Sequence, residues 1–475
     1  MESSQTIPQI TACNESTIGE LYHHLFAGLR YRLKNDQWLE PDGFHWKIGN
    51  QEILNRDLSA LQAQIKRDYN ILEENPRNIL NKLNSSNGIR DIKYWLNSMP
   101  DLLIETTQLN AHKYILPLAN GAYDMQEHEF IGDEQSCREL LFTRHMPVQY
   151  NPQAQCLRFR QFLEEIMLGD QELIRYLLKL IAQALLGDPK EDIVVFFIGS
   201  HQNGKTTLLQ LLAHIFKDFY ATVSPSLLVH NKQHSGSERW EKACLEGARI
   251  AVIDELDQGC EFNCATFKQL SSAGTIKVER KYSDPRAIPV THSLFVSTNH
   301  MPVPTGDPAI RRRIIIIPFD YVVPNHLKNI NLANELIAES EGILLLLLQA
   351  LQQYQKEGLE PKPAKVHLAL VKHKLSDGCQ MWLEEHYSKS AEADKIALST
   401  IHEDYKAWCN AAEQDLPESC STPRKFAARL RTLGFKVERS TNNQSFVWGI
   451  KAKQACIPPS FSQNQHIEED CSATG

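Results

Sequence analysis

A glycine-rich loop at residues 199–206 limits what this chain can fold into more than any other stretch of the sequence. It reads G-x-x-x-x-G-K-T. A continuous apolar run precedes it at residues 193–198, which is typical of a strand buried on both faces, and the leucine-rich residues 207–213 predict a helix. Strand, loop and helix in this order are the context in which the pattern holds phosphate; a chance glycine turn is the alternative. The sequence therefore predicts a parallel α/β core around an anion-binding loop.

The chemistry of such a loop predicts its ligand. The glycines let several backbone N–H groups converge on one anion, and the following helix adds its positive end. Lys205 is expected to reach the β- and γ-phosphates of a nucleoside triphosphate, and Thr206 to coordinate Mg²⁺. We therefore predict that ATP and Mg²⁺ are bound by Gly199, Ser200, His201, Gln202, Asn203, Gly204, Lys205, Thr206 and Thr207.

Polar residues end two further apolar runs. Residues 249–255 predict a buried strand that ends in Asp254 and Glu255. Ligands of a parallel α/β sheet bind at the carboxyl ends of its strands, so Asp254 is predicted to hold Mg²⁺ and Glu255 to take a proton from the attacking water. A solvated turn is the alternative. Residues 292–299 predict another strand ending in Asn299, whose neutral amide suits orienting water against the γ-phosphate.

Three adjacent arginines, Arg311, Arg312 and Arg313, stand directly before a fourth apolar run at residues 314–317. Three neighbouring guanidinium groups before a fully apolar strand cannot all be buried in one subunit. At least one is therefore expected to point at a partner or a phosphate, and a solvated basic turn is the alternative.

Composition sets outer limits on function. The 475 residues suffice for two to four domains, and the net charge of −8 means that contact with nucleic acid must come from local patches. The eleven cysteines include no C-x-x-C pair, which favours reduced thiols. We see no signal peptide and no apolar run long enough for a bilayer, so the prediction is a cytoplasmic protein without a membrane partner.

The C-terminal region carries a local reversal of charge. Residues 421–453 contain eight cations and one acidic residue, Glu438, a balance of +7. Two predicted helices precede a basic helix that Ser421 would cap, and two strand-like runs follow, which is a winged-helix pattern. A solvated basic helix in a protein–protein adaptor is the alternative. The DNA contacts predicted here are Arg424, Lys425, Arg429 and Arg431.

The order of these motifs resembles superfamily 3 helicases, most closely the helicase part of phage and plasmid primase-helicases and of the related poxvirus primase-helicase. The loop ending in Gly-Lys-Thr comes first, then apolar-Asp-Glu, then apolar-Ser-Thr-Asn, then Arg-Arg before Ile-Ile-Pro-Phe. Residues 116–124 and 141–152 resemble the domain that precedes the ATPase in this family, and residues 339–344 resemble the segment that follows it.

The resemblance implies an AAA+-type ATPase that assembles into a ring, commonly a hexamer, with ATP between subunits. Lys205, Thr206, Asp254, Glu255 and Asn299 would serve one site from one subunit. Arg312 or Arg313, preferably Arg312, would reach across from the neighbour as an arginine finger. The implied fold is α/β, with these domains: an α+β N-terminal domain at 1–155, a helical collar at 156–188, the P-loop ATPase with a parallel sheet at 189–372, a winged-helix-like domain at 373–455 and a disordered tail at 456–475.

The family also carries a hairpin that lines the central channel, between the second and third strands. Cations there would neutralise the phosphates of single-stranded DNA, and an aromatic ring would offer a stacking face; an ordinary exposed hairpin is the alternative. The candidate contacts are Lys268, Lys277, Arg280, Lys281, Tyr282 and Arg286. The chain departs from the family at residues 272–274, where it has Ser-Ala-Gly in place of the usual Gly-Gly-Asp.

These observations predict an ATP-driven, ring-forming DNA helicase that replicates a phage, prophage or plasmid element. A nucleotide-gated initiator or scaffold that binds an origin with little unwinding is the first alternative, kept open by residues 272–274. An AAA+-type ATPase that acts on protein is the second, and the basic C-terminal region argues against it. We find no zinc-ribbon cysteines and no paired aspartates, so we expect no primer synthesis by this chain, with a separate primase and polymerase as partners where needed.

Overall fold

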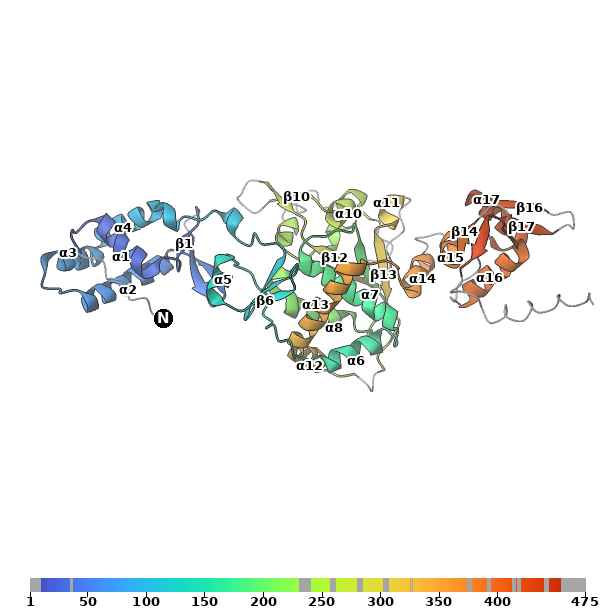
Figure 1. The fold of residues 1–475 in the computed structure, drawn as a ribbon, viewed down its shortest axis with the longest axis horizontal. Coiled ribbons are helices and arrows are strands. Elements are labelled where there is room, and N and C mark those ends of the chain that lie inside the picture. Colours follow the sequence, from blue (N-terminus) through green and yellow to red (C-terminus); the bar gives the residue numbers. More distant parts are fainter. Residues whose placement is uncertain are drawn as a thin grey trace, which may run out of the picture.

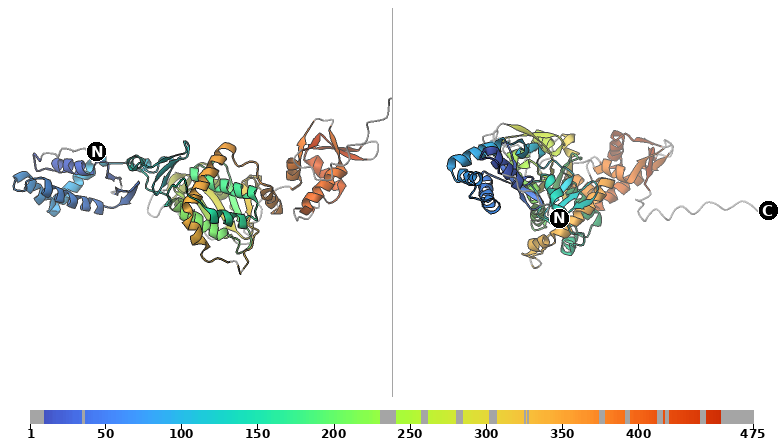
Figure 2. Two further views of the ribbon diagram at one scale, coloured as in Figure 1. Left: turned by 60° about the horizontal axis from the view of Figure 1, so that its bottom comes forward. Right: turned by 60° about the vertical axis from the view of Figure 1, so that its left-hand side comes forward.

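The structure is a computed structural model of the 475-residue chain. The described residues are 10–34, 37–229, 241–256, 262–279, 285–301, 307–324, 326, 328–373, 378–390, 394–411, 416, 420–439 and 444–453. Within these ranges the chain forms a helical N-terminal body, a central body around a parallel sheet, and a small C-terminal body, arranged along the long axis of the molecule (Figure 1). Figure 2 shows the same three bodies from two further sides.

The N-terminal body is a helical bundle followed along the chain by small antiparallel sheets. Its helices are α1 (Glu15–Phe26), α2 (Glu52–Asp68), α3 (Glu74–Leu83) and α4 (Ser86–Ser98). Between α1 and α2 lies a small sheet in which β2 (Trp38–Asp42) pairs antiparallel with both β1 (Tyr31–Arg32) and β3 (His45–Gly49).

A buried carboxylate ties this helical bundle together. The side chain of Asp57, on α2, is 3% exposed and forms an ion pair with Arg30 at 2.7 Å. The Tyr22 hydroxyl of α1 donates a hydrogen bond to the same carboxylate at 3.0 Å. A carboxylate in an apolar core is tolerated only where its charge is paired and hydrogen-bonded, so the three side chains act as one unit.

We predict that Asp57→Ala destabilises the N-terminal body by about 3 kcal/mol, because it leaves a buried guanidinium and hydroxyl without their acceptor. Hydrogen exchange of the α1–α4 peptides, followed by mass spectrometry, measures the loss. The matched control is Lys34→Ala, which breaks an exposed ion pair with Glu105 and should cost under about 1 kcal/mol. Equal protection in the two variants would contradict the prediction.

A second antiparallel sheet lies between the helical bundle and the central body. Its strands lie in the order β4 (Ile115–Leu118), β5 (Gly121–Asp124) and β6 (Glu129–Ile131), and the short helix α5 (Glu134–Glu139) follows them in the chain. Leu118 pairs with Gly121, so Ala119 and Asn120 form the turn between β4 and β5. Gly121 is needed because a Cβ there would lie 2.3 Å from the carbonyl oxygen of Ile131 on β6.

The segment at 144–152, which the sequence suggested as a linker, is packed against the core. Met146 and Val148 are buried in the same apolar cluster as the central helices. Asn120 closes the segment with two hydrogen bonds to the backbone of Tyr150, at 2.8 and 3.0 Å. The segment is extended as predicted, but its apolar side chains contribute to folding.

The helical block before the glycine-rich loop matches the prediction closely. It contains α6 (Leu157–Ile166), α7 (Gln171–Ala182) and the 3-10 helix η3 (Gln183–Leu186), with the expected interruption at Gly169-Asp170. Asp170 caps α7 by accepting a hydrogen bond from the backbone N–H of Leu173 at 3.0 Å. The apolar faces of both helices pack on one side of the central sheet.

The central sheet has five parallel strands, and its chain order is not its spatial order. The strands are β7 (Val194–Ile198), β8 (Tyr220–Thr222), β9 (Ile250–Asp254), β12 (Ser293–Thr298) and β13 (Ile314–Pro318). They lie in the order β13-β7-β12-β9-β8, so the strand before the glycine-rich loop is flanked by the last two strands of the sheet. Four of the five strands are buried along nearly their whole length, and β8, at one edge of the sheet, is buried only at its central residue. This confirms the predicted α/β core with a parallel sheet.

Helices cover both faces of this sheet. On one face lie α6, α7, α8 (Lys205–Phe216), α12 (Leu332–Ala338) and α13 (Ser340–Glu357). On the other lie α10 (Cys264–Ser271), α11 (Pro308–Arg311), α14 (Ala364–Lys372) and an antiparallel hairpin of β10 (Thr275–Val278) and β11 (Arg286–Pro289). The hairpin that the family resemblance implied is therefore present between the third and fourth strands of the sheet in chain order.

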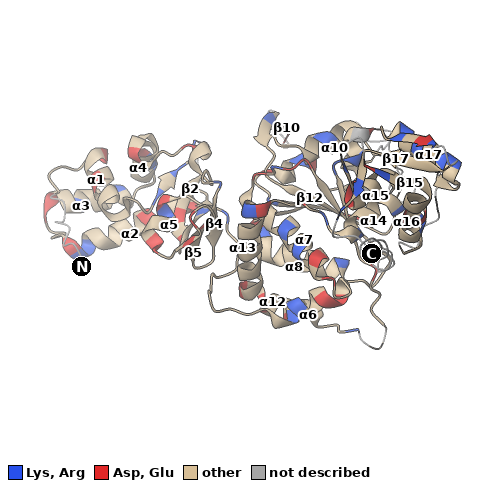
Figure 3. Ribbon diagram, turned by 45° about the vertical axis from the view of Figure 1, so that its right-hand side comes forward, with Lys and Arg blue, Asp and Glu red and all other residues tan. Residues whose placement is uncertain are grey.

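The C-terminal body alternates helices and short strands. Its elements are α15 (Gly378–His386), β14 (Tyr387–Lys389), β15 (Lys395–Ala397), α16 (Leu398–Ala411), α17 (Pro423–Thr432), β16 (Lys436–Arg439), β17 (Ser445–Trp448) and β18 (Ile450–Ala452). A three-stranded antiparallel sheet β15-β17-β16 packs against α16 and α17. Basic residues mark α17 in Figure 3.

One cap in this body differs from the prediction. Thr422, not Ser421, caps α17, because its hydroxyl accepts a hydrogen bond from the backbone N–H of Lys425 at 3.3 Å. Two neighbouring hydroxyl residues cannot be distinguished by type alone. The predicted tail at 456–475 lies outside the described residues. Among the residues that the structure describes, no helix combines the length and apolar character needed to cross a bilayer.

Candidate functional site

The glycine-rich loop turns sharply from β7 into α8. The geometry of the loop requires glycine at both glycine positions of the motif. A Cβ on Gly199 would lie 2.2 Å from the carbonyl oxygen of Phe319, and Gly204 has φ +89°. Asn203 is buried and its side-chain amide donates to the same Phe319 oxygen at 3.1 Å. The loop is thus tied to the residue that follows β13, which holds it at the carboxyl edge of the sheet.

Lys205 is buried at the first position of α8, and it has no carboxylate hydrogen-bond partner in the described part of the chain. Its ammonium group donates to the carbonyl oxygens of Gly199 at 2.5 Å and Ser200 at 3.0 Å. It also donates to the Asn299 side-chain oxygen at 3.2 Å. Burial lowers the pKa of Lys205, while the charges of Asp254 and Glu255 act in the opposite direction. The group is therefore a cation held by neutral acceptors, which an anion could replace.

The strand register brings the predicted polar residues to one edge. Thr298 on β12 pairs with Ile198 on β7, and Ser297 pairs with Asp254 on β9. The three strands therefore end at the same level, and Asp254 and Glu255 are exposed there. The backbone N–H of Glu255 donates to the carbonyl oxygen of Ser297 at 2.8 Å, which fixes the first residue beyond β9.

The residue types at this edge suit a magnesium–nucleotide complex. Thr206 is exposed in the first turn of α8, and a hydroxyl with a carboxylate such as Asp254 is the oxygen donor set that Mg²⁺ prefers. Ser200, His201 and Gln202 are exposed along the loop, so a phosphate can approach the backbone N–H groups there. The structure thus groups the predicted nucleotide and metal residues without assigning a role to any of them.

A cavity of about 700 Å³ opens beside the loop. Gly199, Ser200 and His201 line it on one side and Asn299 on another. Further walls come from the end of β13, from Lys365 and Lys372 on α14 with His373 directly after it, and from Ala411 at the end of α16. Sequence reasoning missed the contribution of α14, because nothing in residues 364–372 distinguishes them from an ordinary amphipathic helix.

The three arginines before β13 have different environments. Arg313 is buried, with a side chain 10% exposed, and forms an ion pair with Asp192 at 2.7 Å. It also donates to the carbonyl oxygen of Ala309 at 3.0 Å and to the Ser272 hydroxyl at 3.1 Å. Arg311 and Arg312 are exposed. Arg313 is thus committed to contacts within its own subunit, whereas Arg312 is oriented to solvent.

We predict that Arg313→Ala lowers the stability of the central body by about 1–3 kcal/mol, because three hydrogen bonds to a buried guanidinium are lost. Arg312→Ala is the matched control and should change stability by under about 0.5 kcal/mol, as expected for an exposed residue. Thermal unfolding of the two variants measures the difference. Equal melting temperatures would show that the buried ion pair does not stabilise the fold.

Residues 272–274, where the chain departs from the family pattern, begin beside the buried Arg313. Where the family has Gly-Gly-Asp, Ser272 contacts Arg313, and Asp192 supplies the carboxylate that pairs with this arginine. Gly274 has φ +145°, a conformation that favours glycine before β10. Asp192 gave no signal in the sequence, because an isolated acidic residue before a strand is usually solvated.

The predicted DNA contacts near the hairpin are spread over different environments. Lys277 is exposed on β10. Lys268, on α10, forms an ion pair with Asp307 at 2.5 Å, and Arg286 on β11 forms one with Glu246. Arg280, Lys281 and Tyr282 lie outside the described residues. Two of the predicted cations therefore have acidic partners, so a phosphate would have to compete for them.

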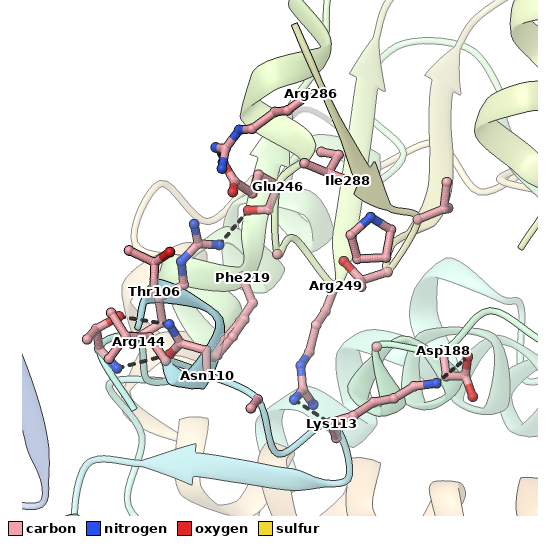
Figure 4. A pocket seen from close by; sticks show the side chains of 18 of the residues that line it. Thr106, Asn110, Lys113, Arg144, Asp188, Phe219, Glu246, Arg249, Arg286 and Ile288 are labelled. Carbon is pink, nitrogen blue, oxygen red and sulfur yellow. Dashed lines mark hydrogen bonds and ion pairs between the residues drawn. The ribbon is translucent and has the colours of Figure 1, made fainter. Parts of the chain in front are cut away.

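Arg286 lies at a cavity of about 1030 Å³ between the N-terminal sheets and the central body (Figure 4). Arg144 crosses this junction and donates to the carbonyl oxygen of Glu246 at 2.6 Å. Arg249 is fully buried there, with burial lowering its pKa to about 10, and it donates to the carbonyl oxygens of Lys113 and Ile115 at 3.3 and 3.4 Å. Arg144 and Arg249 join the two parts of the chain. In Figure 4, Arg249 points from the sheet toward the N-terminal strands, and Arg144 points the opposite way, toward Glu246.

The predicted cations of α17 lie mainly at the surface. Arg424, Lys425 and Arg431 are exposed and Arg429 is half-buried. Arg431 donates to the carbonyl oxygen of Val437 at 3.0 Å, and Arg429 to the Thr432 hydroxyl at 3.3 Å. Most of the predicted cations of α17 are thus at the surface of the C-terminal body.

Comparison with known proteins gives two family matches and several viral relatives. Residues 18–168 match the family described as D5 N terminal like, and residues 197–313 match a family of unknown function, DUF5906. A candidate helicase of Acanthamoeba polyphaga mimivirus, L207/L206, is 23% identical over 422 residues, which cover 80% of this chain and 43% of the relative. A candidate helicase of the Sputnik virophage, V13, is 25% identical over 197 residues, covering 38% of this chain and 25% of the relative.

A third relative, the candidate helicase 022R of Frog virus 3 (isolate Goorha), is 26% identical over 162 residues, covering 33% of this chain and 17% of the relative. The chain thus spans less than half the length of these curated relatives. Among solved structures, the apo C-terminal region of NrS-1 is 12% identical, covers 91% of this chain and 98% of that one, and has a TM-score of 0.41. The sequence matches confirm the resemblance stated above.

Proposed function

We propose, from the premise that this chain is of the phage and viral primase-helicase type, that it is an ATP-dependent DNA helicase with an AAA+-type core. The observation that carries the proposal is the hydrogen bond of 3.2 Å from the Lys205 ammonium to the Asn299 side-chain oxygen. It lies at the edge of the sheet where Asp254 and Glu255 also lie, at the end of β9. A triphosphate bound by the loop would lie between a lysine, an acidic pair and a neutral amide, which is the arrangement that phosphoryl transfer to water requires.

Each side chain has a distinct part in the proposed reaction. The Lys205 ammonium would leave the carbonyl oxygens of Gly199 and Ser200 for the β- and γ-phosphates, since a charged partner outcompetes neutral ones. Glu255 would accept the proton of the attacking water, and Asn299 would hold that water in line. Mg²⁺, held by Thr206 and Asp254, would supply positive charge against the phosphate oxygens.

The proposed catalytic site is completed by a second copy of the chain. Arg312 is exposed before β13, while Arg313 is held by Asp192 within its own subunit. Arg312 is therefore the better finger, and a ring, proposed to be a hexamer, would place it at the neighbour's triphosphate. The parallel pairing of β13 with β7 supports this proposal, because Arg312 precedes the amino end of β13 and so lies at the sheet edge opposite the loop of its own subunit.

We predict that Lys205→Ala and Arg312→Ala each lower ATP hydrolysis by at least about 100-fold, because each removes a cation from the transferring phosphoryl group. Mixing the two inactive variants should restore part of the activity, since one copy supplies an intact loop and the other an intact finger. A chain with both substitutions, mixed with itself, is the control. Unwinding that survives both single substitutions would contradict the helicase proposal.

A nucleotide-gated initiator or scaffold is the second candidate, favoured by the altered residues 272–274 and by the acidic partners of Lys268 and Arg286. The double variant Lys281→Ala with Tyr282→Ala separates the two. A motor should keep ATP hydrolysis and lose strand separation, because the channel contacts no longer grip the DNA. A scaffold should keep both assembly and origin binding. ATPase, unwinding and DNA-binding assays on the same preparation measure the outcome.

The C-terminal body supports action on DNA more than on protein. Its order of helix, two strands, two helices and hairpin supports the proposed winged-helix-like domain, with α17 as the proposed recognition helix for duplex DNA. The exposed cations of α17 would contact phosphates, and single-stranded DNA would pass the β10–β11 hairpin. Failure to bind DNA at moderate salt would revive the protein-directed alternative. We propose no primer synthesis by the residues of this chain, so incorporation of labelled ribonucleotides would contradict that part.

A further inference from the structure

The small C-terminal sheet has two different faces. Lys395 on β15 and Lys436 on β16 both pair with Trp448 on the central strand β17, so the three side chains lie in one row on one face. Phe446 lies two residues before Trp448 and therefore shares this face. Val447, between them, points the other way, into the core against α16 and α17.

The outer face thus carries two aromatic rings and several lysines. The Lys395 ammonium lies 4.8 Å from the ring centroid of Phe446 and 4.9 Å from that of Trp448. Both rings are half-buried, and Lys395 and Lys436 are exposed. This face is opposite to α17, so it is separate from the cations that the sequence analysis assigned to DNA.

A cavity of about 480 Å³ opens at the edge of this row. Its walls include Lys389 and Ser390 at the end of β14, Lys436 and Glu438 on β16, and Trp448. The Ser390 hydroxyl and the Trp448 indole N–H are both buried, and neither has a hydrogen-bond partner among the residues that the structure describes. A buried donor without a partner costs about 1–3 kcal/mol, so a ligand that displaced the side chains covering these two atoms would gain two hydrogen bonds.

The charged side chains around the cavity favour a ligand with negative charge. Lys389 and Lys436 are exposed cations, Lys395 adds a third on the adjoining row, and Glu438 is the acidic residue among the described lining. Glu438 pairs with Lys436 at 3.3 Å, with both side chains more than half exposed, so that pair is readily exchanged for another partner. An excess of cations beside unpaired donors and aromatic rings fits an anionic, aromatic ligand.

We propose that this outer face, which we call the lysine–tryptophan face (Lys389, Ser390, Lys395, Lys436, Phe446 and Trp448), binds a single strand of DNA. Phosphates would lie against the lysines, an acceptor atom of the nucleotide in the cavity would take the hydrogen bonds of Ser390 and Trp448, and a base would contact the aromatic edge. The proposal rests on the proposed function only for the choice of DNA as the anionic polymer. The C-terminal body then contacts nucleic acid on two opposite faces.

The test uses the full chain and a fluorescein-labelled oligothymidine, with binding followed by fluorescence anisotropy at several salt concentrations. Lys389→Ala with Lys436→Ala should weaken binding about tenfold and reduce the slope of log affinity against log salt by about 1.4, since each contact with a single strand contributes about 0.7. Trp448→Phe keeps an aromatic ring and loses the N–H, and should weaken binding about threefold with little change of slope.

The matched control is Lys47→Ala with Lys66→Ala, which removes two exposed lysines from the N-terminal body and should leave affinity and slope unchanged. Thermal unfolding shows whether each variant is folded. If the Lys389/Lys436 variant binds as tightly as the unaltered chain, or if the control variant loses as much affinity, this inference is wrong while the proposed function stands. If the unaltered chain binds no oligothymidine, the inference falls, and the subunit-mixing experiment still judges the ATPase independently.

Discussion

The site depends on the parallel register of three neighbouring strands. Because β7, β9 and β12 end at one level, the loop after the first, the acidic pair after the second and the asparagine after the third meet at a single edge. A shift of one residue in any strand would exchange the side chains packed on the two faces of the sheet and move its polar end away from the others. The apolar side chains that fix the register therefore also fix the geometry of the site, and Asn203 and Gly199 only hold the loop against it.

Much of this geometry follows from the sequence, because strand, glycine loop and helix are local patterns with strong constraints. The four apolar runs, the interrupted helical block, the hairpin and the alternating C-terminal body could all be predicted from periodicity or resemblance. The cap of α17 is Thr422, one residue beyond the predicted Ser421, because the two neighbouring hydroxyl residues have similar propensities. Element types depend on many residues, whereas such boundaries depend on one or two.

Long-range partners could not be predicted. The three adjacent arginines are equivalent in the sequence, and only the fold shows that Arg313 meets Asp192 and Ser272, which are distant along the chain. The same holds for α14, whose side chains line the cavity beside the loop, and for Trp448, whose unpaired indole N–H depends on strand pairing. In each case the missing information was which residues the topology brings together, not which chemistry they carry.

The position of α14 has a mechanical consequence. This helix packs against β13 and lines the cavity beside the glycine-rich loop, and the chain continues from it into the C-terminal body. Under the proposed function, a nucleotide that entered this cavity would contact the helix from which the C-terminal body continues. The position of that body relative to the sheet would then be coupled to nucleotide binding.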